Sequence, residues 1–285
     1  MLRVGIIGCG RIAGGFEYLP GRIFPSTHAG AYTENLNTKL VAASDNNRKN
    51  LEKFVQTWEI ESHYDNHNEM LSNEKLDLVS ICTHDDSHFE IIKDSIDKGV
   101  KNIFCEKPLA RNSQQILDLI KYCKKYQTNL FVNHTRRWHD RYVYVKKVIK
   151  QKRLGSMISI TGRYTSGIRV IGSHMIDILR FFSGEIIYVK GMVEPSVSNE
   201  KLDYSENFDS NDKSYSAIMK FQNGVIGFLD GTSKKKYLIF EIEMQFEKGK
   251  LVLSNNGEKL DIWEKNSNKL FKIKNKKLKI RPMMQ

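Results

Sequence analysis

Short apolar runs alternate with amphipathic stretches through the first 135 residues of this 285-residue chain. The 3.6-residue spacing of apolar positions predicts helices over 48–57, 87–98 and 113–126. The runs between these helices are typical of strands covered on both faces, and they span 3–8, 40–45, 78–83, 102–107 and 130–134. The alternation predicts a doubly wound parallel sheet, and therefore an α/β domain over residues 1–135.

The pattern changes after residue 135. A basic amphipathic helix over 139–152 precedes runs in which apolar and polar residues alternate, and the turn signals QNG (222–224) and NNG (255–257) separate some of them. A second helix, Ser173–Phe182, interrupts the strands, with Ser173 in the N-cap position. The strands are expected over 156–164, 186–193, 215–221, 225–232, 238–246 and 250–255. Residues 136–285 therefore read as a second domain, of α+β type with a largely antiparallel sheet.

The segment GIIGCGRIA ends the first strand with Gly8, Gly10 and Ala13 in the GxGxxG/A pattern. Gly8 permits a tight turn, Gly10 lets a diphosphate approach the backbone, and Ala13 lets the following helix lie close to the strand. The position of the motif, after a strand and at the start of an apparent helix, predicts a dinucleotide site in a Rossmann domain.

Asp45 closes the second strand, where a carboxylate can bind the ribose hydroxyls and repel a 2′-phosphate. This favours NAD over NADP, although Arg48 leaves NADP open and Asp45 can also be a turn residue. Asp45 lies later than usual because of the extra segment GGFEYLPGRIFPST, which is expected to form a loop near cofactor or substrate.

Two further segments carry ionisable groups. Glu106 and Lys107 end another parallel strand, where a partly desolvated lysine held by the glutamate could exchange a proton with a substrate hydroxyl. The alternative is an ordinary surface ion pair before Pro108. His174 and Asp177 are three residues apart, on one face of the predicted helix. They are either capping and pairing groups or groups that face a ligand.

Six motifs occur together in the order and spacing of the Gfo/Idh/MocA family, the group of glucose–fructose oxidoreductase and inositol dehydrogenase: GCGRIA, THAGAY (27–32), CTHDDSH (82–88), CEKPLA, NHTRRW (133–138) and GSHMID (172–177). The chain resembles this family over nearly its whole length. The resemblance implies a Rossmann domain followed by an open-faced domain whose sheet often forms the oligomer contact, here a homodimer or homotetramer. It also implies NAD(P)-dependent hydride transfer at a CH–OH carbon of a sugar, cyclitol or nucleotide-linked sugar.

The resemblance suggests roles for particular residues. Lys107 and His174 are expected to be catalytic, and no metal is expected. The expected cofactor contacts are Gly8, Gly10, Arg11, Ile12, Asp45, Arg48, Thr83, His88 and Glu106. The expected substrate contacts are Lys107, Arg137, Arg169, His174 and Asp177. Arg136 and Arg163 are further basic groups for a carboxylate or diphosphate, and the alternative for each of these arginines is a role in surface solubility or packing. Two positions depart from the family pattern: Val170 stands where many members have an aspartate, and Thr83-His84 replaces the usual Thr-Pro.

Three other functions remain open: an NAD-dependent glycosidase, a non-catalytic NAD- or sugar-binding protein, and an anion or nucleic-acid binder. The last rests on charge: residues 1–135 hold 16 Lys/Arg and 17 Asp/Glu, residues 136–285 hold 29 and 16, and eight basic residues lie in 265–281. That segment reads first as a solvated strand or tail, and it lacks a recognisable nucleic-acid module. The four scattered cysteines, the absence of a long apolar run and an N-terminal sequence unlike a signal peptide predict a cytoplasmic protein with reduced thiols and no membrane association.

Overall fold

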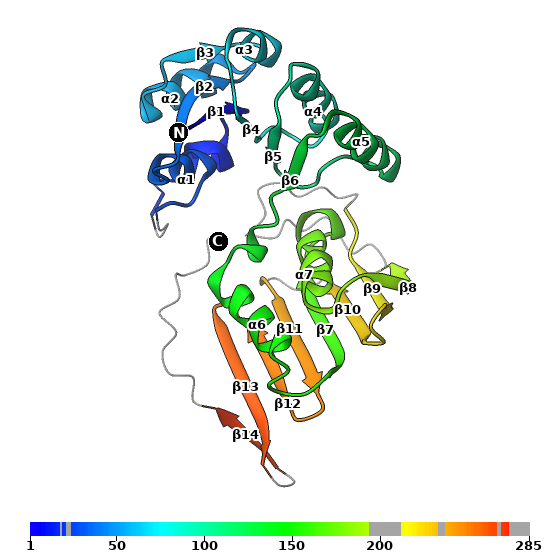
Figure 1. The fold of residues 1–285 in the computed structure, drawn as a ribbon. Coiled ribbons are helices and arrows are strands. Elements are labelled where there is room, and N and C mark those ends of the chain that lie inside the picture. Colours follow the sequence, from blue (N-terminus) through cyan, green and yellow to red (C-terminus); the bar gives the residue numbers. More distant parts are fainter. Residues whose placement is uncertain (18, 21–23, 194–211, 233–236, 267–268, 274–285) are drawn as a thin grey trace. The chain divides into compact units, whose positions relative to one another are not determined.

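The computed structural model describes residues 1–17, 19–20, 24–193, 212–232, 237–266 and 269–273. The chain divides into two compact units, Met1–Asn133 and a second one that begins at His134 (Figure 1). Each unit has its own hydrophobic core.

The first unit is built on six parallel strands in the order β3-β2-β1-β4-β5-β6. The strands are β1 (Leu2–Ile7), β2 (Thr38–Ser44), β3 (Ser62–Tyr64), β4 (Leu78–Ile81), β5 (Asn102–Cys105) and β6 (Asn129–Val132). The order reverses between β1 and β4, so ligands of such sheets bind outside the carboxyl ends of these strands. The predicted parallel sheet is confirmed, with the short strand β3 in addition to the five that the sequence indicated.

The α-helices of this unit are α1 (His28–Glu34), α2 (Arg48–Trp58), α3 (His67–Asn73), α4 (His88–Asp97) and α5 (Ser113–Tyr126). Asparagine side chains start three of them by accepting a backbone N–H: Asn47 for α2, Asn66 for α3 and Asn112 for α5. The apolar faces of α4 and α5 supply Ile91, Ile92 and Leu119 to the core beside the sheet.

The helix expected directly after the glycine motif is only a five-residue π-helical turn, η1 (Arg11–Gly15). Two glycines end it, and a Cβ added at Gly14 would lie 2.2 Å from Nε1 of Trp58. The extra segment then closes on itself: the buried Glu17 carboxylate accepts the backbone N–H groups of Ser26 at 2.6 Å and Thr27 at 2.9 Å. A regular helix begins only at α1.

The second unit contains an eight-stranded sheet in the order β14-β13-β12-β11-β7-β10-β9-β8. The neighbours are antiparallel except β7 and β10, which are parallel. The strands are β7 (Met157–Thr165), β8 (Ile186–Val193), β9 (Tyr215–Phe221), β10 (Ile226–Thr232), β11 (Phe240–Phe246), β12 (Gly249–Ser254), β13 (Lys259–Asn266) and β14 (Lys269–Ile273). The predicted largely antiparallel sheet is confirmed. The sequence analysis missed β13, and it read the segment that contains β14 as a solvated strand or tail.

Helices α6 (Asp140–Lys150) and α7 (Ser173–Ser183) cover one face of this sheet (Figure 1). Tyr142 of α6 stacks on Phe182 of α7, with ring centroids 6.2 Å apart. Short helical turns precede both helices, η2 (Thr135–Arg137) and η3 (Ile168–Gly172). None of the helices among the described residues is long and apolar enough to span a membrane.

The prediction that Ser173 is an N-cap is wrong. Ser173 has helical backbone angles, φ −59° and ψ −40°, and its hydroxyl donates to the Arg169 carbonyl at 2.8 Å. The chain is already helical from Ile168, and the carboxylate of Asp212 accepts the N–H groups of Arg169 at 2.9 Å and Val170 at 3.1 Å. A cap from a distant segment therefore starts this helical region.

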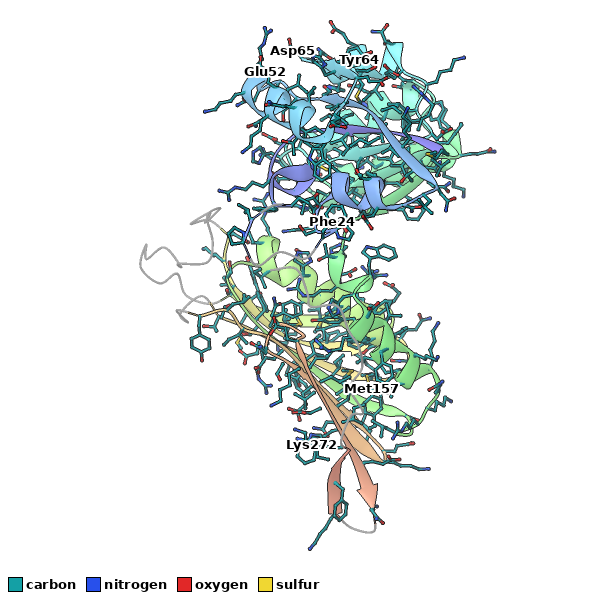
Figure 2. All side chains as sticks on the ribbon, turned by 90° about the vertical axis from the view of Figure 1, so that its left-hand side faces the viewer. Phe24, Glu52, Tyr64, Asp65, Met157 and Lys272 are labelled. Carbon is teal, nitrogen blue, oxygen red and sulfur yellow. The ribbon has the colours of Figure 1, made fainter. Side chains whose placement is uncertain are left out.

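The basic segment 265–281 is described only in part. Within it, Lys272 of β14, which is labelled in Figure 2, pairs with Asp261 at 2.6 Å. Its ammonium lies 5.6 Å from the centre of the Trp263 ring. These contacts make this part of the segment the last strand of the sheet. Residues 267–268 and 274–285 lie outside the described residues.

Candidate active site

The glycine turn after β1 meets the requirements of a dinucleotide cradle. Gly8 has φ +89°, and an added Cβ would lie 2.8 Å from backbone atoms of Cys82 and Thr83. A Cβ added at Gly10 would meet nothing within 4 Å, so the turn is open there to an approaching group. The geometry fits a bound diphosphate above Gly10.

Asp45 follows β2 and holds this turn. One carboxylate oxygen accepts the Cys9 N–H at 2.7 Å, and the other accepts the Asn47 N–H at 2.7 Å. The side chain therefore joins the glycine turn to the N-terminus of α2. A half-buried carboxylate at this position is the group that binds ribose hydroxyls in NAD-binding folds.

Three neighbouring cofactor candidates have different surroundings. Arg11 is exposed at the start of η1, with its guanidinium 5.7 Å from the Phe16 ring. Ile12 packs against the apolar core around β1. Arg48 is exposed and forms an ion pair with Glu52 at 3.0 Å, one turn further along α2.

Thr83 and His88 shape the loop after β4. The Thr83 hydroxyl accepts a hydrogen bond from Ser87 at 2.8 Å. His88 is buried, with Nδ1 2.8 Å from the Pro108 carbonyl and Nε2 3.0 Å from the Thr83 carbonyl. The ring therefore links this loop to the turn that carries Lys107, which makes His88 a support of the site.

A buried hydrogen-bond network lies behind Glu106. Oε1 of Glu106 is 2.9 Å from Nε2 of His28 and accepts the Asn133 amide at 2.7 Å. Nδ1 of His28 is 2.6 Å from the Ser80 hydroxyl. The second carboxylate oxygen faces the backbone N–H of Lys107 at 3.3 Å. Four segments at the carboxyl edge of the sheet thus fix the residue that precedes the candidate catalytic lysine.

The charges in this network are strongly perturbed. Burial alone would lower the pKa of His28, but the Cys82 thiol and the Glu106 carboxylate beside the ring raise it to about 10. Burial raises the pKa of Glu106, yet hydrogen bonds from His28 and Asn133 and the charge of Lys107 bring it below its ordinary value. The pair is therefore a buried histidine–carboxylate ion pair. Perturbed ionisable groups of this kind concentrate at functional sites.

In the second unit, His174 and Asp177 lie in the first turns of α7 as the spacing predicted. Asp177 is buried and receives both hydrogen bonds of the Arg137 guanidinium, each at 2.8 Å. The rings of His134 and His174 meet edge to face with centroids 5.7 Å apart, and Nε2 of His134 is 4.0 Å from Asp177. Asp177 and Arg137 are thus a bidentate pair that ties η2 to α7 beside His174.

The other basic candidates are also distinct in their surroundings. Arg136 is buried, with its guanidinium 3.7 Å from the centre of the Phe240 ring. Arg163 pairs with Asp230 across β7 and β10 at 3.8 Å. The side chain of Arg169 is exposed on η3, five positions before His174.

The sequence analysis gave no role to His28, Asn133, His134 or Asp212. The first three occur in motifs that were recognised, THAGAY and NHTRRW, so a signal for them was present. Asp212 lies 42 residues from Val170 in the sequence, and nothing local marked it.

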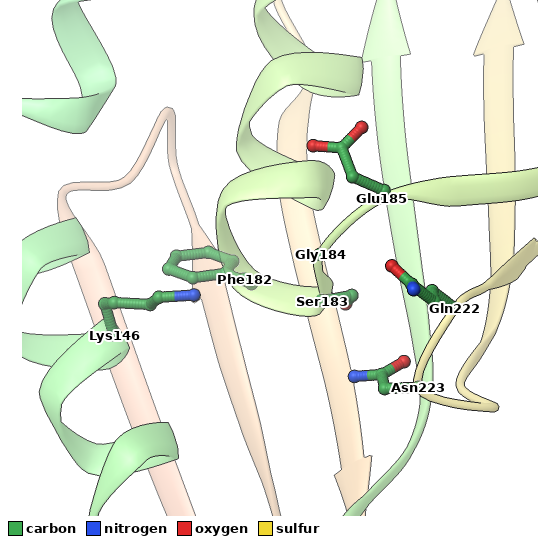
Figure 3. Close-up of a pocket in the computed structure, with 7 residues that line it drawn as sticks. All are labelled: Lys146, Phe182, Ser183, Gly184, Glu185, Gln222 and Asn223. Carbon is green, nitrogen blue, oxygen red and sulfur yellow. The ribbon is translucent and has the colours of Figure 1, made fainter.

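The described residues also line a pocket of about 370 Å³ at the C-terminal end of α7 (Figure 3). Lys146 of α6, Ser183 and Asn223 contribute to it. His174 lies nine residues before Ser183, which is about 14 Å along a helix axis. This pocket is therefore separate from the residues with candidate chemistry.

Comparison with known proteins identifies the type of the first unit. Residues 2–134 match the model of the GFO_IDH_MocA group, described as an oxidoreductase family with an NAD-binding Rossmann fold. Over these residues, which form the first unit, the chain is similar to the Gfo/Idh/MocA oxidoreductases. This similarity agrees with the six-stranded parallel sheet, the glycine turn and the carboxylate after β2.

Similarity to known proteins extends beyond the first unit. Myo-inositol 2-dehydrogenase from Thermotoga maritima is 25% identical over 276 residues, which cover 89% of this chain and 75% of the relative. Two solved structures share the fold: an Agrobacterium radiobacter oxidoreductase in complex with NAD+, L-tartaric acid and magnesium, and the WlbA dehydrogenase from Bordetella pertussis in complex with NADH and UDP-GlcNAcA. The first has a TM-score of 0.78 and 19% identity and covers 95% of this chain and 79% of that one. The second has a TM-score of 0.76 and 20% identity, and the match covers 92% of this chain and 81% of that one.

Proposed function

We propose that this oxidoreductase transfers hydride between NAD(H) and a CH–OH or keto carbon of a sugar or nucleotide-linked sugar. The observation that carries the proposal is Lys107, which directly follows a carboxylate fixed by His28 and Asn133 at the carboxyl edge of an NAD-binding sheet. The relatives act on or bind molecules of the same chemistry: inositol in one and UDP-GlcNAcA in another.

In the proposed reaction, bound NAD supplies the hydride acceptor. Lys107 accepts the proton of the substrate hydroxyl while the carbon loses its hydride, and the product is the carbonyl compound. His174 serves as the second acid–base group. In the reducing direction Lys107 returns the proton to the carbonyl oxygen.

The cofactor preference is proposed to be NAD, with NADP less suited, because Asp45 places a carboxylate where the 2′-phosphate of NADP would lie. In this proposal Gly8 and Gly10 contact the diphosphate of the cofactor, and the neighbouring contacts come from Arg11, Ile12 and Thr83. Arg169, exposed on η3, is proposed to contact an anionic group of the substrate.

A homodimer or homotetramer in the cytoplasm is also proposed. The face of the second sheet opposite α6 and α7 presents Ile218 and Phe228, which are 53% and 41% exposed. They are cross-strand neighbours on β9 and β10, so they form a continuous apolar patch that a second copy could cover.

The test begins with nicotinamide absorbance on a panel of sugars and nucleotide sugars. For the substrate that changes it, Lys107→Ala should lower kcat about 10²- to 10⁴-fold, the usual contribution of a general base. Binding of NADH should stay within about twofold, because Lys107 is proposed to act on substrate. Lys98→Ala is the matched control, since Lys98 is exposed at the end of α4. Full turnover by Lys107→Ala would refute the assignment of the base.

A further inference from the structure

His28 is buried at the start of α1, and both of its ring nitrogens lie within hydrogen-bond distance of polar partners. Its side chain is 3% exposed, and its ring lies 5.2 Å from that of Phe104. The polar groups that face it come from every neighbouring element: Tyr32 through Ser80, Cys82 after β4, Glu106 after β5 and Asn133 after β6.

The effect of His28 on Glu106 follows from the count of hydrogen bonds. Oε1 of Glu106 receives the His28 ring at 2.9 Å and the Asn133 amide at 2.7 Å. Oε2 faces the next residue, Lys107, whose charge stabilises the carboxylate. The negative charge of the Glu106 carboxylate is therefore stabilised by three residues together: His28, Asn133 and Lys107.

We propose that His28 is a positioning residue for proton transfer: its Nε2 holds Oε1 of Glu106, which fixes the carboxylate beside Lys107 and limits its pull on the Lys107 ammonium. The inference rests on the proposed function of Lys107 as the base. A carboxylate that lost the His28 donor would attract the Lys107 ammonium more strongly, and a larger share of Lys107 would stay protonated. A protonated amine cannot accept the substrate proton.

The experiment measures Lys107 itself. Competitive labelling with acetic anhydride across pH, read peptide by peptide by mass spectrometry, reports the pKa of the Lys107 amine in the full chain, with exposed Lys98 as an internal standard. His28→Ala should raise that pKa by about half to one unit, which makes the neutral amine about three- to tenfold scarcer at a given pH. His28→Gln keeps an N–H donor and should restore most of the wild-type value. Glu106→Gln removes the negative charge and should move the pKa in the opposite direction.

The matched control is His67→Ala. His67 also pairs with a carboxylate in this unit, Asp94, at 2.9 Å, but it lies in α3 and its partner in α4. This substitution should leave the titration of Lys107 unchanged. If His28→Ala fails to fold, the other two variants still decide the matter: the pKa of Lys107 should stay near its wild-type value in His28→Gln and fall in Glu106→Gln.

Turnover separates the inference from the proposed function. With a substrate found, His28→Ala should lower kcat about tenfold and move the acid limb of its pH profile upward, while the KM for NAD changes little. An unchanged Lys107 titration in His28→Ala, or equal shifts in His28→Ala and His28→Gln, would overturn the inference even in an active enzyme. The expected shifts without turnover on any substrate would uphold the link from His28 to Lys107 and count against the proposed oxidoreductase chemistry.

Discussion

The Arg137–Asp177 pair gives an asymmetric prediction for stability. Asp177 has a side chain that is 10% exposed, whereas that of Arg137 is 36% exposed. Arg137→Ala leaves a carboxylate that is largely cut off from water, and removing one partner of a buried pair costs about 3–5 kcal/mol. Asp177→Ala leaves a guanidinium that can still reach water, so we expect a smaller loss of about 1–2 kcal/mol.

A double-mutant cycle tests the coupling of these two side chains. The double variant Arg137→Ala/Asp177→Ala should be no less stable than Arg137→Ala alone, because it no longer contains the stranded carboxylate. The coupling energy should be about 1–3 kcal/mol, as for two direct charge-assisted hydrogen bonds. Since the chain has two units, unfolding in guanidinium should be followed together with hydrogen exchange of the peptide that contains α7.

The control for the cycle is Arg180→Ala, which breaks the exposed pair of Arg180 with Glu185 at the other end of α7. The side chain of Arg180 is 43% exposed and that of Glu185 is 64% exposed, so the loss of their ion pair should lower the free energy of unfolding by less than about 1 kcal/mol. Equal losses in Arg137→Ala and Asp177→Ala, or a coupling energy near zero, would refute the claim that the carboxylate is held mainly by Arg137. They would favour a role for Asp177 as a direct substrate contact.

Three other predictions follow from the two units. Asp45→Ser removes the carboxylate that accepts the Cys9 N–H, so NADH binding should weaken about tenfold while NADPH binding improves, as fluorescence titration of both would show; an unchanged ratio would contradict the role of Asp45. The pKa of His28 is raised to about 10, so its ion pair contributes stability that is fully present below about pH 6.5 and is lost as the pH rises through 10. In thermal melts at pH values between these limits, the wild-type protein should thus lose stability as the pH rises, and His28→Gln should lose less. Ile218→Glu should convert the proposed dimer to monomers in light scattering, whereas Leu36→Glu, at a 90% exposed position in the first unit, should not; a wild-type monomer would refute the proposal.

The sequence predicted the parallel sheet well because its strands are apolar throughout and follow a regular alternation with helices. It overestimated the first helix, since the GxGxxG/A pattern does not say how far the helix continues. Gly14 packs against Trp58 and α2, and the chain leaves the helix one residue later. The strand β13 was missed because its apolar alternation is short: only Leu260 and Ile262 are buried, and charged residues surround them.

Local spacing identified the residues with candidate chemistry but not their partners. His174 and Asp177 had to share a helix face, because residues three apart always do. Whether the Asp177 carboxylate meets a ligand or a cation depends on Arg137, which is 40 positions away in the sequence. The same limit applies to Glu106, whose partner His28 is 78 positions away, and to Val170, whose backbone is capped by Asp212.

These partners, distant in the sequence, bear on which side chains are available for proton transfer in the proposed reaction. Val170 supplies no carboxylate, Asp212 accepts two backbone N–H groups, and Asp177 is held by both arms of Arg137. The carboxylates near the start of α7 are therefore engaged in building that region of the second unit. In the first unit, by contrast, the Glu106 carboxylate is fixed directly beside an ionisable lysine and is balanced by a buried histidine. In the proposed chemistry Lys107 is therefore the principal proton acceptor, and kcat should respond more steeply to Lys107→Ala than to Asp177→Asn.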